Sequence, residues 1–221
     1  SFFLCNNRFC SIFWKMRHEQ NMINGGSFRV KIGTPKELFE GERRVAMTPD
    51  SAAQLQKLGH DCVIETGAGA EAGFSDASYT AAGVEIVKTA AALWKAADVV
   101  AKVRAPNEIE VKRLRGGQTM ISFINPAANE KLLASAAKKG STVVAMDMVP
   151  RISRAQKMDA LSSMANIAGY RAVIEAGNNF GRFFTGQITA AGKVPPAKVL
   201  VVGAGVAGLA AVGTATSLGA I

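Results

Sequence analysis

The sequence lacks the residue patterns that metal sites, disulfide frameworks and membrane-spanning helices require. Its three cysteines, Cys5, Cys10 and Cys62, form no CxxC pair and have no histidine at ligand spacing. We therefore expect no metal site and no structural disulfide, and a reducing compartment fits best. No apolar run reaches the roughly 18 to 20 residues that a bilayer-crossing helix needs. We expect a soluble piece without a membrane span of its own.

Clustering of positive charge is also absent. The formal net charge of +9 would allow a nucleic-acid partner, but the lysines and arginines do not gather on one element as an electrostatic footprint would. The densest basic run, Lys112 to Arg115, follows Glu108 and Glu110, and we interpret it as the solvated end of a helix. No nucleic-acid-binding motif is present, so we expect no nucleic-acid partner.

The chain does contain enough apolar sequence for a core. Its 221 residues are 48% hydrophobic and 19% charged, which suits one large or two small globular domains. Residues 1–28 differ from the rest, because they lack an initiating Met, begin with aromatic residues and cysteine, and end in a polar stretch at Ser27. We interpret them as a poorly ordered extension, from translated upstream sequence or a cloning remnant rather than an organelle presequence, whose amphipathic pattern is weak here.

From residue 29 onward, short β-branched runs alternate with helical stretches, which is typical of a parallel α/β sheet. Helices are predicted to begin after Thr48, Ser75 and Thr89, because these residues are good N-caps. The predicted strands are Val30–Ile32, Cys62–Glu65, Val84–Val87, Val99–Val103, Met120–Phe123 and Thr142–Met146. The predicted fold class is α/β, with two Rossmann-like parallel-sheet domains joined by a long helix, the first over residues 29–150.

The long helix is predicted to begin at Ser153. Ser153 and Gln156 stand at capping-box spacing, and an apolar stripe follows as far as about residue 177. Residues 151–179 would then be a connecting loop and helix. The segment from Phe180 to Pro196 is rich in glycine and threonine and ends in two prolines, so it is interpreted as a loop rather than an element.

The strongest motif lies in residues 180–221, which are expected to begin an NAD-binding Rossmann domain. The apolar run Val199–Val202 precedes Gly203-Ala-Gly205-Val-Ala-Gly208, and a helical stretch follows. In such a strand, turn and helix, Gly203 makes the tight turn, Gly205 lets the backbone approach a pyrophosphate, and Gly208 allows close helix packing. The helix N-terminus would supply N–H groups to the phosphates. The alternative is a glycine-rich turn selected only for packing.

The acidic residue that would bind the ribose, about 20 residues after the first glycine, would fall beyond Ile221. Local chemistry therefore does not separate NAD from NADP, and the second sheet would be incomplete. We expect a fragment that binds a dinucleotide poorly by itself.

Five segments carry a family resemblance: Gly33-Thr-Pro-Lys-Glu37, Glu42-Arg-Arg-Val-Ala-Met-Thr-Pro49, Glu65-Thr-Gly-Ala-Gly69, Pro150 through Ala172, and Thr189 through Ala197. Together they closely resemble the NAD(H)-binding domain of proton-translocating transhydrogenase. The resemblance covers about residues 29–221. The long stretch around Arg151 is the most specific part, because alanine dehydrogenase shares the fold and much of the early sequence.

The resemblance implies hydride exchange between NAD(H) held by this chain and NADP(H) held by a separate domain, coupled to proton movement through a membrane domain. In this family an Arg, a Gln, an Asp and a Ser contact the nicotinamide end of the cofactor. On motif match, these are Arg151, Gln156, Asp159 and Ser162. Direct hydride transfer requires no general acid or base, so positioning is the catalytic task. The resemblance also implies a homodimer, at the bacterial cytoplasmic face or in the mitochondrial matrix, and a fragment that is inactive alone.

Simpler roles stay open for these residues. Gln156 could cap the predicted helix through Ser153, and a side chain occupied in that way is less free to hold a nucleotide. Asp159 and Ser162 could be favourable first-turn residues near a helix dipole.

Alanine dehydrogenase is the nearest alternative function. It needs a cation for the substrate carboxylate and a histidine for acid/base work. By resemblance, its histidine aligns with Asn125 and its substrate-binding lysine aligns with Arg104. Arg44 matches the family's substrate-contacting arginine, yet could equally pair with Glu42 or Glu37 at the surface.

No histidine of the chain looks catalytic. His18 lies in the extension, and His60 is interpreted as a surface residue of a helix-to-strand turn. A third alternative, from a different class, is a truncated, non-catalytic module that keeps the first domain for dimerisation or for docking a partner and lacks half of the cofactor site.

Overall fold

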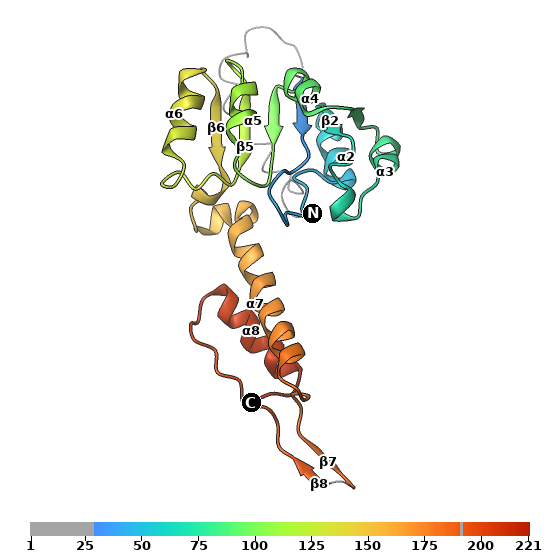
Figure 1. Cartoon of the computed structure of the whole chain (residues 1–221), viewed down its shortest axis with the longest axis vertical. Helices are drawn as coiled ribbons and strands as arrows, with labels where there is room; N and C mark the ends of the chain where they lie inside the picture. The colour runs from blue at the N-terminus through green and yellow to red at the C-terminus, as the bar shows by residue number, and fades with distance from the viewer. Residues whose placement is uncertain (1–28, 191) are drawn as a thin grey trace. The chain divides into compact units, whose positions relative to one another are not determined.

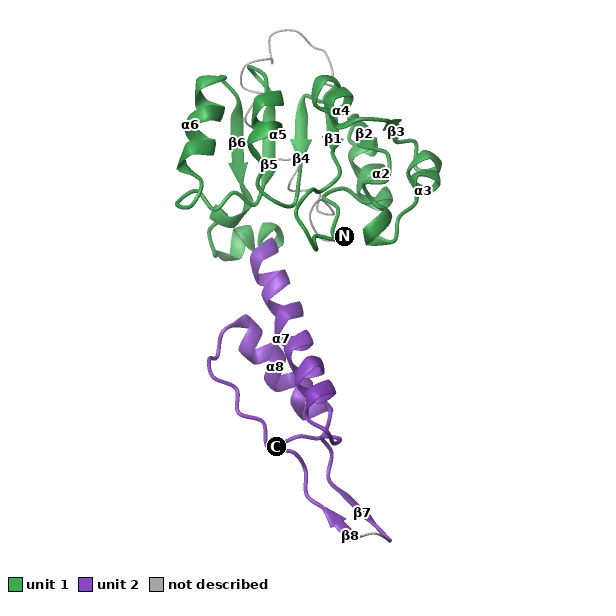
Figure 2. Cartoon of the chain, in the orientation of Figure 1, with its two compact units in different colours: residues 1–159 green, residues 160–221 purple. Residues whose placement is uncertain are grey.

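The computed structural model describes residues 29–190 and 192–221. The chain divides into two compact units, residues 1–159 (unit 1) and residues 160–221 (unit 2), shown in Figure 2. Each unit is described by itself. The expectations for the extension 1–28 lie outside the described residues.

Unit 1 is built on a parallel sheet of six strands in the order β3-β2-β1-β4-β5-β6 (Figure 1). The strands are β1 (Lys31–Thr34), β2 (Asp61–Glu65), β3 (Glu85–Val87), β4 (Val99–Ala101), β5 (Thr119–Ser122) and β6 (Thr142–Ala145). Every neighbouring pair is parallel, so each connection must cross back over the sheet. All six predicted strands and the predicted α/β fold class are confirmed, although the strand ends differ slightly.

The helices of unit 1 are α2 (Pro49–Lys57), α3 (Asp76–Ala81), α4 (Ala90–Ala96), α5 (Glu108–Arg113) and α6 (Glu130–Lys138). Four of them, α2 to α5, begin where a side chain accepts a hydrogen bond from a first-turn backbone N–H, whereas α6 has no side-chain cap. Thr48, Ser75 and Thr89 each accept a hydrogen bond from the backbone N–H three residues later, so the three predicted helix starts are confirmed. The helix expected to end near Lys112–Arg115 is α5, and it begins at a capping box between Asn107 and Glu110 that was not predicted.

Two apolar clusters cover opposite faces of this sheet. Successive residues of a strand point to opposite faces, and on β2 Val63 belongs to one cluster while Ile64 belongs to the other. The first cluster packs Trp94 of α4 together with residues of α5 and α6, and the second packs Leu55 of α2 and Tyr79 of α3. Because the strands are parallel, the loops that follow them all lie at one edge of the sheet.

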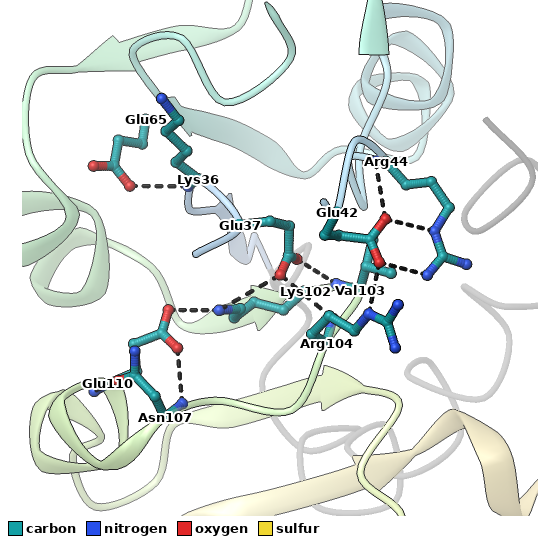
Figure 3. A network of polar contacts seen from close by, with 10 residues as sticks. All are labelled: Lys36, Glu37, Glu42, Arg44, Glu65, Lys102, Val103, Arg104, Asn107 and Glu110. Carbon is teal, nitrogen blue, oxygen red and sulfur yellow. Dashed lines mark hydrogen bonds and ion pairs between the residues drawn. The ribbon is translucent and has the colours of Figure 1, made fainter. Parts of the chain in front are cut away.

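A buried ion cluster lies where β4 ends (Figure 3). The Nζ atom of Lys102 lies 2.5 Å from Oε1 of Glu110 and 3.7 Å from Oε2 of Glu37, and all three side chains are at most 4% exposed. The backbone N–H of Val103 also donates to Glu37, at 2.6 Å. Burial raises the pKa of Glu37, although the charge of Lys102 and the backbone donors act in the opposite direction. The cluster joins the loop after β1 to the end of β4 and to α5.

Replacement of Lys102 should destabilise unit 1 strongly. Lys102→Ala leaves Glu110 and Glu37 buried without their counter-charge, and we expect the free energy of unfolding to fall by about 3–5 kcal/mol. Urea unfolding followed by circular dichroism measures this loss. Lys95→Ala, at an exposed position of α4, is the matched control and should change stability by no more than about 0.5 kcal/mol. Equal losses from the two variants would contradict the role of the cluster.

Unit 2 consists of two helices and a hairpin: α7 (Ala160–Asn179), β7 (Gln187–Thr189), β8 (Gly192–Val194) and α8 (Val206–Ser217). The long helix thus begins later than predicted. Ser153–Met158 form a 3-10 helix preceded by Ile152 without a side-chain cap, so the predicted capping box between Ser153 and Gln156 is wrong. Asp159 has a ψ of 78°, which lies outside the helical region and separates the 3-10 helix from α7.

The interpretation of Phe180–Pro196 as a loop is also wrong. It contains the antiparallel hairpin β7–β8, with Gln187 opposite Val194 and Thr189 opposite Gly192 (Figure 1). Gly192 has a φ of 116°, a conformation that glycine adopts without steric cost and that permits the reversal. The glycine and threonine content of the segment concealed these two short strands.

The run Val199–Val202, predicted to be a strand, pairs with no strand among the described residues. The N–H of Val199 donates to the carbonyl of Ile221 at 2.8 Å, and Leu200 and Val202 are 88% and 91% exposed. Strand structure depends on hydrogen bonds to a neighbouring strand, so β-branched sequence alone does not produce one here. The glycine turn and α8 follow this run as predicted.

Candidate nucleotide-binding site

The glycine-rich turn before α8 has backbone geometry that only glycine accommodates. Gly203 has a φ of 110°, where an L side chain would be strained. A Cβ atom on Gly208 would lie 1.9 Å from the carbonyl oxygen of Gly203, so the chain folds back too closely for any side chain. A Cβ atom on Gly205 would meet no described protein atom within 4 Å. The protein therefore leaves space open beside Gly205 but not beside Gly208.

The first turn of α8 suits an anion. Gly205 is the N-cap residue and makes no side-chain cap hydrogen bond, and the helix has no acidic residue in its first turn. The first N–H groups of a helix lack intrahelical partners and carry a partial positive charge. The exposed turn at Gly203 and Gly205 thus fits the pyrophosphate of a dinucleotide in both shape and charge.

The four residues expected at the nicotinamide end are divided between the two units. Arg151, Gln156 and Asp159 lie in the last ten residues of unit 1, and Ser162 lies in the first turn of α7 in unit 2. Arg151 and Gln156 are exposed, whereas Asp159 and Ser162 are half-buried. Because the 3-10 helix has no side-chain cap, Gln156 is not occupied in the capping role that was its simpler interpretation.

A second polar cluster lies at the carboxyl edge of the sheet in unit 1 (Figure 3). Arg44 donates through Nε and Nη2 to the two oxygens of Glu42, at 2.7 and 2.6 Å, and Arg104 donates through Nε to the same carboxylate at 2.6 Å. The Glu42 side chain is only 3% exposed. Burial alone would raise the pKa of Glu42, but the hydrogen bonds from Arg44 and Arg104 outweigh it and lower this pKa to about 2. Arg44 therefore pairs with Glu42, one of the two partners left open by the sequence.

No imidazole accompanies these cations in the described part of the chain. Asn125, which the resemblance aligns with the histidine of alanine dehydrogenase, has a φ of 49°. The N–H groups of Ile124 and Asn125 donate to Asp147 at 2.8 and 2.7 Å. His60, the one histidine among residues 29–190 and 192–221, lies in the turn before β2, at the opposite edge of the sheet. It is half-buried rather than on the surface, and this burial lowers its pKa.

Residues 29–190 and 192–221 contain neither a membrane-spanning helix nor a metal-binding cluster. No helix there is long and apolar enough to cross a membrane. No group of three or more His, Cys, Asp or Glu side chains there is arranged to hold a metal ion.

Comparison with known families assigns the chain. The family model described as "Alanine dehydrogenase/PNT, N-terminal domain" matches residues 33–168, and the model described as "Alanine dehydrogenase/PNT, C-terminal domain" matches residues 172–221. The chain belongs to this family. The boundary between the two family domains falls within α7, and the resemblance identified from the sequence is confirmed.

Both branches of the family contain relatives of the chain. It is 79% identical over 192 residues to the NAD(P) transhydrogenase subunit alpha of Cereibacter sphaeroides, a match that covers 87% of this chain and 37% of the relative. It is 35% identical over 192 residues to the alanine dehydrogenase of Mycolicibacterium smegmatis, covering 86% and 51%. The crystal structure of transhydrogenase from Sinorhizobium meliloti superposes with a TM-score of 0.82 at 44% identity, covering 86% of this chain and 57% of that one. The chain thus spans between about a third and somewhat more than half of these relatives.

Removal of the Glu42 carboxylate should cost stability in a pH-dependent way. We expect Glu42→Gln to lower the free energy of unfolding at neutral pH by about 2 kcal/mol, because charged hydrogen bonds to two guanidinium groups are lost. The folded-state pKa of Glu42, about 2, lies below the ordinary value of 4.5. Its stabilisation is therefore complete above pH 4.5 and is lost as the pH falls from 4.5 towards 2. Denaturant unfolding at a series of pH values measures the difference between variant and parent.

Glu40→Gln is the control for this prediction, since Glu40 lies in the same loop and is exposed. It should leave stability nearly unchanged at every pH. A loss from Glu42→Gln that does not shrink on acidification would argue against the paired carboxylate as its origin.

Proposed function

We propose that the chain is the NAD(H)-binding component of a proton-translocating transhydrogenase. In this proposal it holds NAD(H) and exchanges hydride with NADP(H) held by a partner domain, while a membrane domain moves protons. The 79% identity to a transhydrogenase subunit alpha supports this assignment. The assignment of NAD(H) rather than NADP(H) to this chain rests on the resemblance.

The observation that carries the proposal is the open glycine turn at the start of α8. The space beside Gly205 is free of described protein atoms, and the helix N-terminus is neither capped by a side chain nor occupied by an acidic residue. Gly203, Gly205 and Gly208 would hold the pyrophosphate through backbone N–H groups and the helix dipole.

At the other end of the cofactor, Arg151, Gln156, Asp159 and Ser162 would orient the nicotinamide. When bound, the nicotinamide ring supplies the carbon that gives or accepts hydride. Hydride passes directly between two such rings, so no side chain of this chain has to donate or remove a proton. The work of these four residues is to fix the ring's position and to keep the approach between the rings short. Arg151 and Gln156 are exposed, as residues that meet a cofactor and a partner domain must be.

Alanine deamination fits the structure less well. Its substrate carboxylate would need an available cation, but Arg44 and Arg104 both donate to Glu42. Its acid/base step would need a titrating group near neutral pH, and the aligned residue is the amide Asn125. Transhydrogenation requires neither a cation for a substrate carboxylate nor a group that titrates near neutral pH.

The partners and location follow from the same proposal. A relative named as an alpha subunit implies further subunits, and these would supply the NADP-binding domain and the membrane proton-channel domain. We propose that the chain acts in a homodimer, as a soluble domain at the cytoplasmic face of a bacterial inner membrane or on the matrix side in mitochondria.

Arg151→Ala in the intact protein tests the proposal. Loss of the guanidinium should leave the nicotinamide less well positioned, and we expect the rate of hydride exchange between NADH and an NADP analogue on a supplied NADP-binding domain to fall about tenfold or more. The rate is followed by absorbance. Arg154→Ala, in the exposed face of the neighbouring 3-10 helix, should leave the rate within about twofold.

Three results would count against the proposal. An unchanged rate in Arg151→Ala would remove Arg151 from the site. An absence of saturable NADH binding by the intact protein would remove the cofactor site. NAD-dependent oxidation of alanine would move the chain to the other branch of its family.

A further inference from the structure

The two helices of unit 2 meet backbone to backbone at a single glycine. Gly169, in the middle of α7, is buried. A Cβ atom built on it would lie 2.0 Å from the carbonyl oxygen of Ala207, 2.8 Å from its carbonyl carbon and 2.9 Å from its Cα. The obstacle is backbone of α8 rather than the end of a flexible side chain, so no rotamer change could relieve it. Any larger residue at position 169 would force the helices apart by about 1 Å or more.

This contact lies at the proposed phosphate turn. Ala207 is the second residue of α8, directly between the N-cap residue Gly205 and Gly208 of the motif. Gly208 in turn approaches the carbonyl oxygen of Gly203 so closely that its own Cβ would lie at 1.9 Å. Two successive close approaches, from Gly169 to Ala207 and from Gly208 to Gly203, therefore fix the turn from two sides.

The requirement for glycine does not extend along the whole helix pair. A Cβ atom on Gly213 of α8 would meet nothing within 4 Å, and one on Gly177 of α7 would make only ordinary contact with Phe184, at 3.5 Å. Further along, the two helices pack through side chains, with Val173 of α7 against a cluster that includes Ala211 and Ala215 of α8. General close packing thus does not explain Gly169, because its contact is confined to the first turn of α8.

We propose that Gly169 is a positioning residue for the cofactor pyrophosphate, acting through the backbone of Ala207. The inference rests on the proposed function, in which the turn at Gly203–Gly208 binds the phosphates. Because α7 is a continuous helix from Ala160 to Asn179, it also carries Ser162, about 10 Å along its axis from Gly169 at 1.5 Å per residue. The helix α7 thereby sets the spacing between Ser162, proposed for the nicotinamide end, and the glycine turn proposed to bind the phosphates.

Gly169→Ala in the intact protein, compared with Gly213→Ala and Gly177→Ala, tests the inference. NADH affinity is measured by fluorescence titration, and ADP and adenosine affinities by competition against NADH. We expect Gly169→Ala to weaken NADH and ADP binding at least tenfold while changing adenosine binding less than twofold, because adenosine has no phosphate to misplace. The two control variants should bind all three ligands as the parent does. They should be at least as stable as the parent, because alanine is more favourable than glycine in a helix interior.

A Gly169→Ala protein that binds ADP like the parent would overturn the inference. So would an equal loss of ADP and adenosine affinity, because that pattern describes general damage to the fold. If the parent itself binds neither NADH nor ADP, the proposed function fails instead, and the two failures are thus distinguishable.

Hydrogen exchange on the parent chain supplies a test that does not depend on the variant folding. ADP should slow amide exchange in the first turn of α8 and also in α7 around Gly169, whereas adenosine should slow neither. Protection of α8 by ADP without any protection of α7 around Gly169 would overturn the inference.

Discussion

Parallel strands need apolar cover on both faces of their sheet, and most of unit 1 follows from this constraint. Neighbouring residues of one strand, such as Val63 and Ile64, enter different cores, so helices must lie on both sides. Those helices are short, and α2 to α5 each begin at a capping side chain, such as Thr48 or Asn107. The crossover connections then bring the loops that leave each strand to one edge, where the ion cluster around Lys102 and the cluster around Glu42 lie.

At that edge, unit 1 satisfies its own charges. Lys102 is paired with two glutamates, and Glu42 is shared by two arginines. In an open α/β sheet, the crevice at the point where strand order reverses is the usual ligand site, and here that point lies between β1 and β4. The side chains around it neutralise one another. Unit 2 differs, because α8 begins at Gly205 without a side-chain cap and without an acidic residue in its first turn.

The sequence predicted features that depend on local chemistry. Alternating apolar runs and capping residues identified the six strands and the helix starts at Thr48, Ser75 and Thr89, because burial and capping act over a few residues. The prediction that the long helix begins at Ser153 was wrong, because capping-box spacing also fits a 3-10 helix. The ψ angle of Asp159 separates this 3-10 helix from α7. The prediction of a strand at Val199–Val202 was wrong for another reason. Strand structure depends on a neighbouring strand, and a local sequence pattern does not contain that strand.

The candidate site also contains some features that the sequence predicted and others that it did not. The glycines of the turn are recognisable because their backbone requirements recur wherever a phosphate is bound. The pairing of Glu42 with both Arg44 and Arg104 was not predictable, because Arg104 is remote in sequence. The sequence did not indicate a role for Gly169, because a glycine inside a helix is merely unfavourable. Its role depends on the backbone carbonyl of Ala207, which lies beside it.

The strand order also bears on how unit 1 folds. Strands β1 to β3 form one half of the sheet and β4 to β6 the other, and each half is contiguous along the chain. Only the β1–β4 ladder joins the halves, and there Lys31 bonds Asp98 across 67 residues. Closing so long a loop is the costly step in assembling a parallel sheet. Glu37 and Val103 belong to opposite sides of that closure, so the ion cluster around Lys102 can be complete only when the two halves have joined.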